Sequence, residues 1–409
     1  MRIAILSIHS SPVGRAGERD TGGMSTYLRG LSRALADAGH EVDLFTRKQD
    51  PAEETVRELA PGVRLVCPDD GHGFLAKEEI YLYSEKIVAS IEDFRRRENT
   101  RYHLIFSHYW LSAWIGELLK SKWKLSHLVM FHTIGRAKNE LCPSEKEPVL
   151  RLEKEEMLAK KCDHLITAST KEKENLVYYF NLSSGKITAI PCGIDRGLFR
   201  PFGASEKLEA KKQIGYGVDE KILFAVGRSE PVKGFDLLIK AASLLPSEDN
   251  FRVVLAGGDP GKDKLLKDLQ KSALDLDLAD RVSFTGTMPH ERLPLYYNAA
   301  DITVIPSFYE SFALVALESL ACGTGVVASP VGIIPELLTW TEKNGCGPLG
   351  CLVEGRSPEV WAAKIMEAVE KRERIDPGTI TATLAPYNWE KAAAELIRQA
   401  RRVIKSPPL

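Results

Sequence analysis

The segment from Glu310 to Glu318 combines two carboxylates with a predicted helix start. Ser311 is placed to cap a helix that Gly323 ends, shortly after an apolar run at residues 302–306. A helix start leaves backbone N–H groups without partners, and such groups bind phosphates well. The donors here are the amides of Phe312, Ala313 and Leu314. The segment therefore indicates a diphosphate site.

The two glutamates admit several functions. Glu318 lies on an otherwise apolar helix, where an unpaired carboxylate is costly, and ribose hydroxyls are suitable partners for it. A continuous helix rises about 12 Å over eight residues, which is wider than the roughly 5 to 9.5 Å between the carboxylates of glycoside hydrolases. The spacing therefore disfavours hydrolysis. The structural alternative is a glutamate at a helix dipole, Glu310, plus a solvated one.

A second loop, from Gly227 to Gly234, directly follows the apolar run at residues 222–226 and carries Arg228 and Lys233. Arginine offers a planar fork and lysine a point charge, so the two can clamp a diphosphate and stabilise it as a leaving group. Two solvated surface cations are the alternative interpretation.

Two shorter motifs add weaker support. Gly22 and Gly23 precede a predicted helix at residues 24–38, and glycine lets a backbone approach a ligand closely. His132 ends the run at residues 128–132, where it could contact a reacting sugar or bond within the sheet. Gly-x-Gly-x-x-Gly is absent after the first run, so a nicotinamide site loses its main support.

The elements that must position these residues follow one repeating pattern. Short apolar runs alternate with amphipathic stretches such as residues 24–38, 235–245 and 293–299. Apolar runs without polar alternation are typical of strands buried on both faces of a parallel sheet. The predicted strands are residues 3–8, 42–46, 63–67, 104–107, 128–132, 165–168, 187–191, 222–226, 253–256, 282–286, 302–306 and 326–329. The pattern predicts an α/β protein of two doubly wound, Rossmann-like domains that face each other across a cleft.

Composition and charge exclude several classes of protein. The 55 Lys and Arg balance 56 Asp and Glu, so no basic surplus favours a nucleic-acid partner. The first apolar run is too short for a signal peptide, and no run is long enough for a transmembrane segment. Seven scattered cysteines are typical of a reduced, cytoplasmic protein, and the close pair Cys346 and Cys351 is interpreted as two free thiols.

Taken together, these segments resemble the retaining glycosyltransferases of family 4, which have the GT-B fold, over nearly the whole chain. The shared motifs are Glu310-x7-Glu318, the loop from Gly227 to Gly234, Gly22-Gly23, and the Pro/Gly-rich linker from Pro191 to Pro201. The resemblance implies an N-terminal acceptor-binding domain of residues 1–195 plus 388–409, with a C-terminal helix that crosses back. It implies a nucleotide-sugar-binding domain of residues 196–387.

The family also implies a reaction and a set of site residues. A hexosyl unit would pass from a nucleotide diphosphate sugar, with a UDP-sugar expected first, and catalysis would need no metal and no cofactor. The catalytic residues would be His132, Glu310, Arg228 and Lys233. Glu310, Arg228 and Lys233 would also bind the donor. The other donor-binding residues would be Gly22, Gly23, Met288, Ser311, Phe312, Ala313, Leu314 and Glu318.

On the acceptor side the likeness narrows to the family's mycothiol-pathway transferases, which add N-acetylglucosamine to inositol phosphate. Lys77, Tyr109, Thr133 and Arg151 would surround the phosphate, and two cations with two hydroxyls suit a dianion. The alternative is that Tyr109 and Arg151 simply pack the first domain. The sequence departs from that group at Ser25. The segment Asp20-Thr21-Gly22-Gly23 is instead similar to sucrose and sucrose-phosphate synthases, whose acceptors are fructose or its phosphate.

Other functions stay open beside this one. They are a nucleotide-sugar 2-epimerase of the same fold, a transferase for an unphosphorylated or lipid-linked acceptor, and a non-catalytic nucleotide-sugar-binding module. The intact set of Glu310, Glu318, Arg228 and Lys233 argues against the last. A homodimer is compatible with the sequence.

Overall fold

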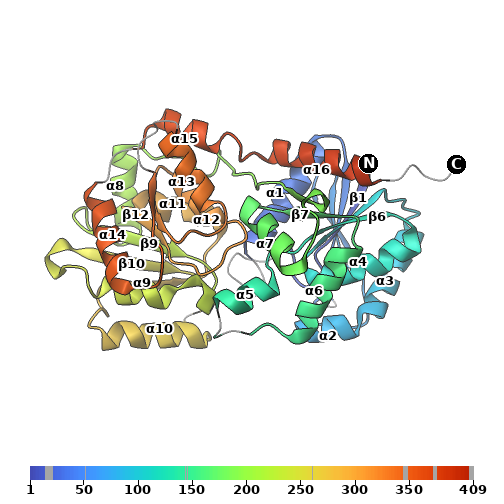
Figure 1. Ribbon diagram of the computed structural model, residues 1–409, viewed down its shortest axis with the longest axis horizontal. Helices are drawn as coiled ribbons and strands as arrows, with labels where there is room; N and C mark the ends of the chain where they lie inside the picture. The colour runs from blue at the N-terminus through green and yellow to red at the C-terminus, as the bar shows by residue number, and fades with distance from the viewer. Residues whose placement is uncertain are drawn as a thin grey trace.

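The computed structural model describes residues 1–13, 22–50, 52–142, 144, 146–259, 261–343, 349–371 and 375–404. These residues form two sheets that lie side by side, each covered by helices (Figure 1). The fold is α/β with two parallel-sheet domains, as the repeating pattern predicts.

The first sheet has the strand order β3-β4-β2-β1-β5-β6-β7-β8. Its strands are β1 (Arg2–Leu6), β2 (Glu41–Phe45), β3 (Val56–Ala60), β4 (Val63–Val66), β5 (Leu104–His108), β6 (Ser126–Met130), β7 (His164–Thr167) and β8 (Ile187–Ala189). β3 pairs with β4 antiparallel, and the other pairs of described strands run parallel. The carboxyl ends of β1, β5 and β6 therefore meet at one edge, toward the second domain.

The second sheet has the order β11-β10-β9-β12-β13-β14, with parallel pairing throughout its described strands. Its strands are β9 (Lys221–Val226), β10 (Phe251–Ala256), β11 (Val282–Gly286), β12 (Ile302–Ile305), β13 (Val326–Ala328) and β14 (Gly350–Leu352). The reversal of strand order between β9 and β12 is the topological switch point, where ligands of such sheets bind.

Helices cover both faces of the two sheets. Those of the first half are α1 (Gly23–Asp37), α2 (Lys77–Leu82), α3 (Ser84–Arg97), α4 (Trp110–Trp123), α5 (Gly135–Leu141), α6 (Val149–Lys161), α7 (Thr170–Phe180) and the 3₁₀ turn η1 (Ser184–Lys186). Those of the second half are α8 (Ala204–Gln213), η2 (Pro231–Lys233), α9 (Phe235–Ala242), η3 (Ser247–Asp249), α10 (Lys264–Asp275), η4 (His290–Arg292), α11 (Leu293–Ala299), α12 (Leu314–Ala321), α13 (Ile334–Lys343), α14 (Pro358–Glu370), α15 (Pro377–Leu384) and α16 (Trp389–Val403).

Two strands were not predicted from the sequence. β3 consists of half-buried and exposed residues at the edge of its sheet, so it lacks the apolar run used to find strands. β14 is only three residues long and follows a Gly/Pro-rich segment. Both lie at sheet edges, where a strand needs less apolar surface than a central one.

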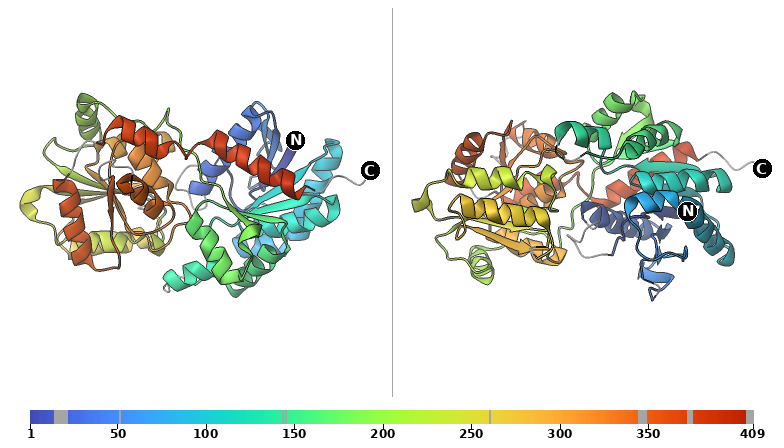
Figure 2. Two further views of the ribbon diagram at one scale, coloured as in Figure 1. Left: turned by 45° about the horizontal axis from the view of Figure 1, so that its top comes forward. Right: turned by 90° about the horizontal axis from the view of Figure 1, so that it is seen from below.

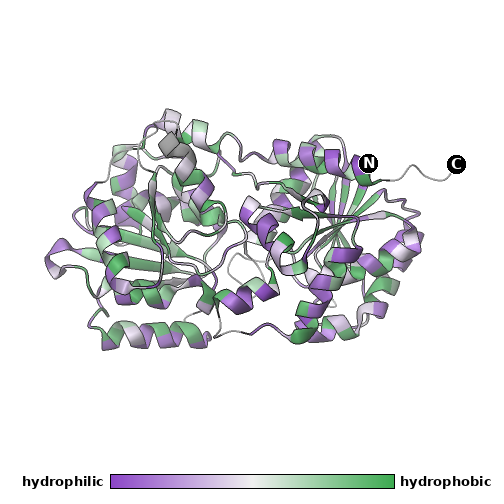
Figure 3. Ribbon diagram, in the orientation of Figure 1, coloured by the Kyte–Doolittle hydropathy of each residue, from purple (hydrophilic) through white to green (hydrophobic). Residues whose placement is uncertain are grey.

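The predicted two-sided burial of the strands is confirmed. Along β1, Ile3 and Ile5 join one apolar cluster, whereas Ala4 and Leu6 join the cluster on the opposite face. Figure 3 shows the same arrangement, with apolar strands at the centre of each domain and hydrophilic residues on the outer helices.

The last helix, α16, returns from the second domain and packs on the first. It lies against α1 and β6, and Ser126 Oγ donates to the Val403 carbonyl (2.8 Å). Both views of Figure 2 show α16, in red, beside the first domain. The helix at residues 388–403 is thus confirmed, while the domain limits at residues 195 and 387 stay predictions.

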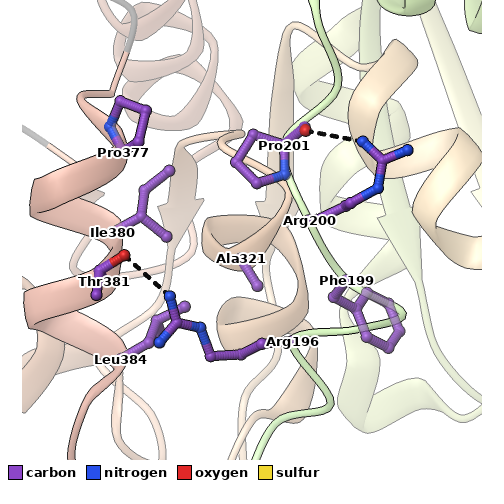
Figure 4. A pocket seen from close by; sticks show the side chains of 9 residues that line it. All are labelled: Arg196, Phe199, Arg200, Pro201, Ala321, Pro377, Ile380, Thr381 and Leu384. Atoms are coloured by element: carbon purple, nitrogen blue, oxygen red, sulfur yellow. Dashed lines mark hydrogen bonds between the residues drawn. The ribbon is translucent and has the colours of Figure 1, made fainter.

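The linker between the domains runs beside this return segment and encloses a small cavity of about 110 Å³. Arg196 crosses it to reach the Thr381 hydroxyl (2.9 Å), as Figure 4 shows. The cavity therefore lies where the chain crosses between the domains.

Candidate functional site

The predicted donor cations lie at the carboxyl end of β9, and each is already paired. Lys233, at the end of η2, approaches Glu310 (Nζ to Oε1, 2.6 Å). Arg228 approaches Glu230 (Nη1 to Oε1, 2.8 Å). Both pairs are partly open to solvent, with 16% of each side chain exposed in the first and 35% and 21% in the second. An anionic ligand would therefore bind by replacing carboxylates.

Glycines of the first domain face the donor loop of the second. A Cβ on Gly22 would lie 3.6 Å from Arg228 Cδ, and one on Gly23 would lie 3.5 Å from Leu314 Cδ1. The fold thus brings together Gly22, Gly23, Arg228 and Leu314, although they come from opposite halves of the chain. Asp20 and Thr21 lie outside the described residues.

The helix start in the Glu310–Glu318 segment is displaced from its predicted position. α12 begins at Leu314, with Ala313 as N-cap in a left-handed conformation (φ 77°), so the prediction of a cap at Ser311 is wrong. The Ser311 carbonyl instead accepts a hydrogen bond from Ser169 Oγ of the first domain (2.6 Å), which holds this residue outside the helix. Gly323 follows the helix end with φ 75°, as predicted.

The two glutamates occupy separate environments. Glu310 accepts from Lys233 and from Ser307 Oγ (2.8 Å), whereas the buried Glu318 meets His290 Nε2 (2.7 Å) and the Tyr297 hydroxyl (2.8 Å). Glu318 is therefore not an unpaired carboxylate. Because Glu310 lies outside α12, the helical spacing used above to disfavour hydrolysis does not apply.

The loop that holds Met288 supports Glu318 from the other side. Met288 is half-buried and lies between β11 and η4, two residues before His290. Burial lowers the pKa of His290, but its hydrogen bond to Glu318 and that carboxylate's charge outweigh burial, so the pKa is raised. The Met288 loop and the second glutamate thus form one unit.

The four predicted acceptor residues also lie together. Arg151 Cζ is 4.9 Å from the centre of the Tyr109 ring, and Lys77 Nζ is 5.9 Å from it. Arg151 Nη2 donates to Thr133 Oγ1 (2.8 Å) and to the Thr133 carbonyl (3.1 Å). The resemblance implied that these four residues, spread over 75 positions of sequence, surround one group. The structure brings them to one place.

Arg151 is more deeply engaged than the sequence suggested. Its side chain is 3% exposed, and it pairs with Glu155 (Nε to Oε1, 2.6 Å) and with Glu147 (Nη1 to Oε2, 2.8 Å). Glu155 also accepts from the Gly135 N–H (2.8 Å). The guanidinium therefore has a structural role whatever else it binds, and the Thr133 hydroxyl that it orients keeps its own proton for a ligand.

His132 lies at the carboxyl edge of the first sheet, two residues after β6. Its Nε2 is 2.7 Å from Nδ1 of His108, the last residue of β5, and burial lowers the pKa of His132 to about 3. His9 follows β1 and stacks on Tyr109, with ring centres 4.2 Å apart. Neither His9 nor His108 was singled out from the sequence, although each directly ends or follows a predicted strand.

Backbone strain gathers at the same place. Tyr109 (φ 74°), His132 (φ 60°) and Ala313 (φ 77°) all have a positive φ, and Ala313 is in the left-handed helical conformation. Such residues cost roughly 1–3 kcal/mol each and persist where the surrounding structure enforces them, often at functional sites. Tyr109 directly follows β5, His132 follows β6, and Ala313 caps the start of α12.

Groups suited to a metal or to a membrane are not found in the part of the chain that the structure describes. It contains no cluster of three or more His, Cys, Asp or Glu side chains arranged to hold a metal ion. None of its helices combines the length and apolar character that crossing a bilayer requires. Cys351 is a free, half-buried thiol in β14, and Cys346 lies outside the described residues.

Comparison with known sequences identifies the family. Residues 21–198 match the family model for Glycosyltransferase Family 4, and residues 206–377 match that for Glycosyl transferases group 1. A D-inositol 3-phosphate glycosyltransferase of Corynebacterium efficiens is 32% identical, covering 97% of this chain and 94% of that protein. A D-inositol 3-phosphate glycosyltransferase 2 of Catenulispora acidiphila is 35% identical, with 96% and 93% covered.

Comparison with solved structures gives the same result for the fold. Sucrose-phosphate synthase from Thermosynechococcus elongatus superposes with a TM-score of 0.87 at 30% identity, covering 98% of each chain. HepE from Anabaena, solved with UDP and glucose, superposes with a TM-score of 0.76 at 18% identity, covering 98% of this chain and all of that one. The architecture is GT-B, and the chain belongs to glycosyltransferase family 4 and is a glycosyltransferase.

Proposed function

We propose that this enzyme transfers a hexosyl unit from a UDP-sugar to a small phosphorylated polyol or sugar, of the inositol phosphate or fructose 6-phosphate type. The observation that carries the acceptor is the cluster of Lys77, Tyr109, Thr133 and Arg151 at the carboxyl edge of the first sheet. It supplies two cations and two hydroxyls beside the donor loop. The relatives named D-inositol 3-phosphate glycosyltransferase support the same class of acceptor.

The donor side has the charges that departure of a nucleotide diphosphate requires. As the bond from the anomeric carbon to the diphosphate oxygen breaks, negative charge grows on that oxygen, and Arg228 and Lys233 stabilise it. The acceptor hydroxyl forms the new bond to the anomeric carbon and passes its proton to the departing diphosphate oxygen. Lys233 pairs with Glu310 at 2.6 Å, so a diphosphate that takes over Lys233 also releases that carboxylate to face the sugar.

The proposal includes retention of configuration and independence of metal ions. The amides at the start of α12 and the two cations can neutralise the diphosphate, which is the task that a metal performs in other nucleotide-sugar enzymes. Turnover that persists in EDTA, and a product with the donor's anomeric configuration by NMR, are the expected results. Loss of turnover in EDTA with recovery on adding Mg²⁺ would overturn metal independence.

A donor-by-acceptor screen tests the whole proposal. UDP-, GDP- and ADP-sugars are combined with inositol phosphate, fructose 6-phosphate and the dephosphorylated form of each acceptor, and nucleotide release is measured. Release that needs a UDP-sugar and a phosphorylated acceptor is expected. An epimerised nucleotide sugar formed from donor alone, or equal rates with dephosphorylated acceptors, would contradict it.

A further inference from the structure

Within the described part of the chain, the side chain of His108 makes one hydrogen bond, and its partner is the predicted reaction-centre histidine. It is fully buried at the end of β5, with Nδ1 2.7 Å from His132 Nε2. Its other neighbours are rings: Phe106 at 4.2 Å and Tyr27 at 5.6 Å between centres. The fold therefore places a second imidazole within hydrogen-bond distance of His132 Nε2.

Both imidazoles are neutral at ordinary pH. Burial lowers the pKa of His108 well below its usual value, with a smaller contribution from His132, and it lowers that of His132 to about 3. A neutral imidazole carries one N–H donor and one acceptor nitrogen. In the bond between them one ring must donate and the other must accept.

The remaining nitrogen of His108 indicates which ring donates. Among the residues that the structure describes, His108 Nε2 is buried and has no hydrogen-bond partner. If His132 donated, the single proton of His108 would sit on Nε2 and be a buried N–H without an acceptor. If His108 donates from Nδ1, only an acceptor lone pair is left without a partner. Buried backbone N–H groups without a partner are rarer in folded proteins than acceptors left without one, and a buried imidazole N–H is disfavoured for the same reason.

We infer that His108 is a positioning residue that donates from Nδ1 to His132 and thereby holds His132 as the Nδ1–H tautomer. His132 then offers an N–H donor, rather than an acceptor, to an oxygen of the substrate in the cleft. The inference rests on the role proposed for His132 at the reaction centre. His108 is itself fully buried, so it acts on the substrate only through His132.

The orientation of the His132 ring is held from a second side. Tyr27 meets it edge to face, with ring centres 5.4 Å apart, and Trp389 meets Tyr27 at 5.7 Å. Trp389 is in turn seated against Gly30 and Gly193, where a Cβ would come within 2.3 and 2.4 Å of its ring. Because these rings restrict rotation of the His132 ring, the bond to His108 determines the tautomer of His132 and not the orientation of its ring.

The tautomer is measured on the full-length enzyme by ¹⁵N NMR of the imidazoles at pH 7. In the wild type, His132 should show a protonated Nδ1 and an unprotonated Nε2. His108→Phe keeps a ring but removes the donor, so the preference for Nδ1–H should weaken and the Nε2–H share of His132 should rise toward that of a free imidazole. His108→Asn keeps a donor near the position of Nδ1, so it should restore the wild-type tautomer. An Nε2–H form of His132 in the wild type, or no change in His108→Phe, would overturn the inference.

Kinetics separate this inference from the proposed role of His132. Loss of a partner that orients a histidine typically costs about ten- to a hundredfold in activity, so kcat of His108→Phe should fall by that factor with donor KM little changed. His108→Asn should recover most of it. His127→Gln is the matched control, because His127 bonds Ser107 Oγ (2.8 Å) in the core of the same two strands. It should lower Tm without changing the His132 tautomer.

The combined outcomes distinguish the two claims. A changed tautomer with unchanged kcat in His108→Phe would overturn the role of His132 in the reaction. An unchanged tautomer would overturn the positioning role of His108, whatever the kinetics of His132→Ala show.

Discussion

On the donor side of the cleft, Lys233 and Arg228 each pair with a single carboxylate and remain partly exposed. On the acceptor side, Arg151 is enclosed between Glu147 and Glu155 and is 3% exposed. An exposed ion pair contributes little to stability and exchanges readily, whereas a buried pair is costly to break. The comparison separates cations that await a ligand from one that also supports the fold. A basic residue near a predicted site can therefore have either of two roles, binding a ligand or supporting the fold.

The largest effect should come from Arg151→Ala. It would leave the Glu155 carboxylate buried with only the Gly135 N–H as a partner, and breaking such a pair costs roughly 3–5 kcal/mol of unfolding free energy. Chemical denaturation measures it. Arg136→Ala is the control, because Arg136 of α5 pairs with Glu156 of α6 in a more exposed setting. Its cost should stay within about 1 kcal/mol. Equal stability losses in the two variants would erase the distinction drawn above.

Lys233→Ala should leave stability nearly unchanged and reduce turnover instead. Removing one charge that stabilises a developing anion typically costs about 10²–10³-fold in kcat. Arg228→Ala should behave similarly. Lys240→Ala, which removes an exposed pair with Asp236 on the neighbouring helix, should have wild-type kinetics. Wild-type rates in both donor-loop variants would refute the diphosphate clamp.

Lys77→Ala should weaken binding of a phosphorylated acceptor without unfolding the protein. A hydrogen bond to a charged group contributes about 1.5–3 kcal/mol, so acceptor KM should rise roughly ten- to a hundredfold. The KM of the dephosphorylated acceptor should hardly move. Lys86→Ala serves as control, since Lys86 is exposed beside Tyr83. If both forms of the acceptor lose affinity equally, Lys77 does not bind phosphate.

Glu230→Gln should produce a smaller effect of opposite sign. The Glu230 carboxylate holds Arg228 in the absence of donor, and a partly exposed pair of this kind contributes about 0.2–1 kcal/mol. Its neutralisation should lower donor KM up to about fivefold. Asp236→Asn, at the exposed pair with Lys240, provides the comparison. A raised donor KM in Glu230→Gln would mean that Glu230 helps to bind the donor rather than competing with it.

The smallest effect expected on turnover is that of pH acting through His132. Because burial depresses its folded pKa to about 3 from an ordinary value near 6.5, the ring stays neutral in the folded enzyme above about pH 4. Turnover should therefore show no inflection near pH 6.5 that His132→Asn removes. Stability linked to this group is present above pH 6.5 and is lost as pH falls toward 3, since the unfolded chain binds the proton first. A turnover inflection that disappears in His132→Asn would show that the ring titrates in the working range.

Much of the fold could be predicted because buried parallel strands have a strong local signal. Every predicted apolar run overlaps a described strand, and the run at residues 282–286 matches β11 without correction. β3 and β14 could not be found in this way, because edge strands need little apolar surface. The start of α12 was misplaced because the bond from Ser169, 142 residues away, competes with local capping at Ser311.

The candidate site also has a part that could be predicted from the sequence and a part that could not. Strand ends and loop motifs pointed to Arg228, Lys233 and Glu310, because carboxyl ends of parallel strands converge. The acceptor residues Lys77, Tyr109, Thr133 and Arg151 came instead from the resemblance to family 4. His108 and the enclosure of Arg151 were not predictable, since they depend on side chains that meet across the sheet and between helices.

The sequence by itself determined the α/β architecture, the two sheets and the residue types at their carboxyl edges, because hydrophobic periodicity and loop chemistry act over a few residues. Only the tertiary structure decided which carboxylate pairs with which cation, that Glu318 has protein partners, and that His108 stands behind His132. Those outcomes depend on distances of about 3 Å between segments far apart in the chain, where the cost of burying an unpaired polar group selects the partner.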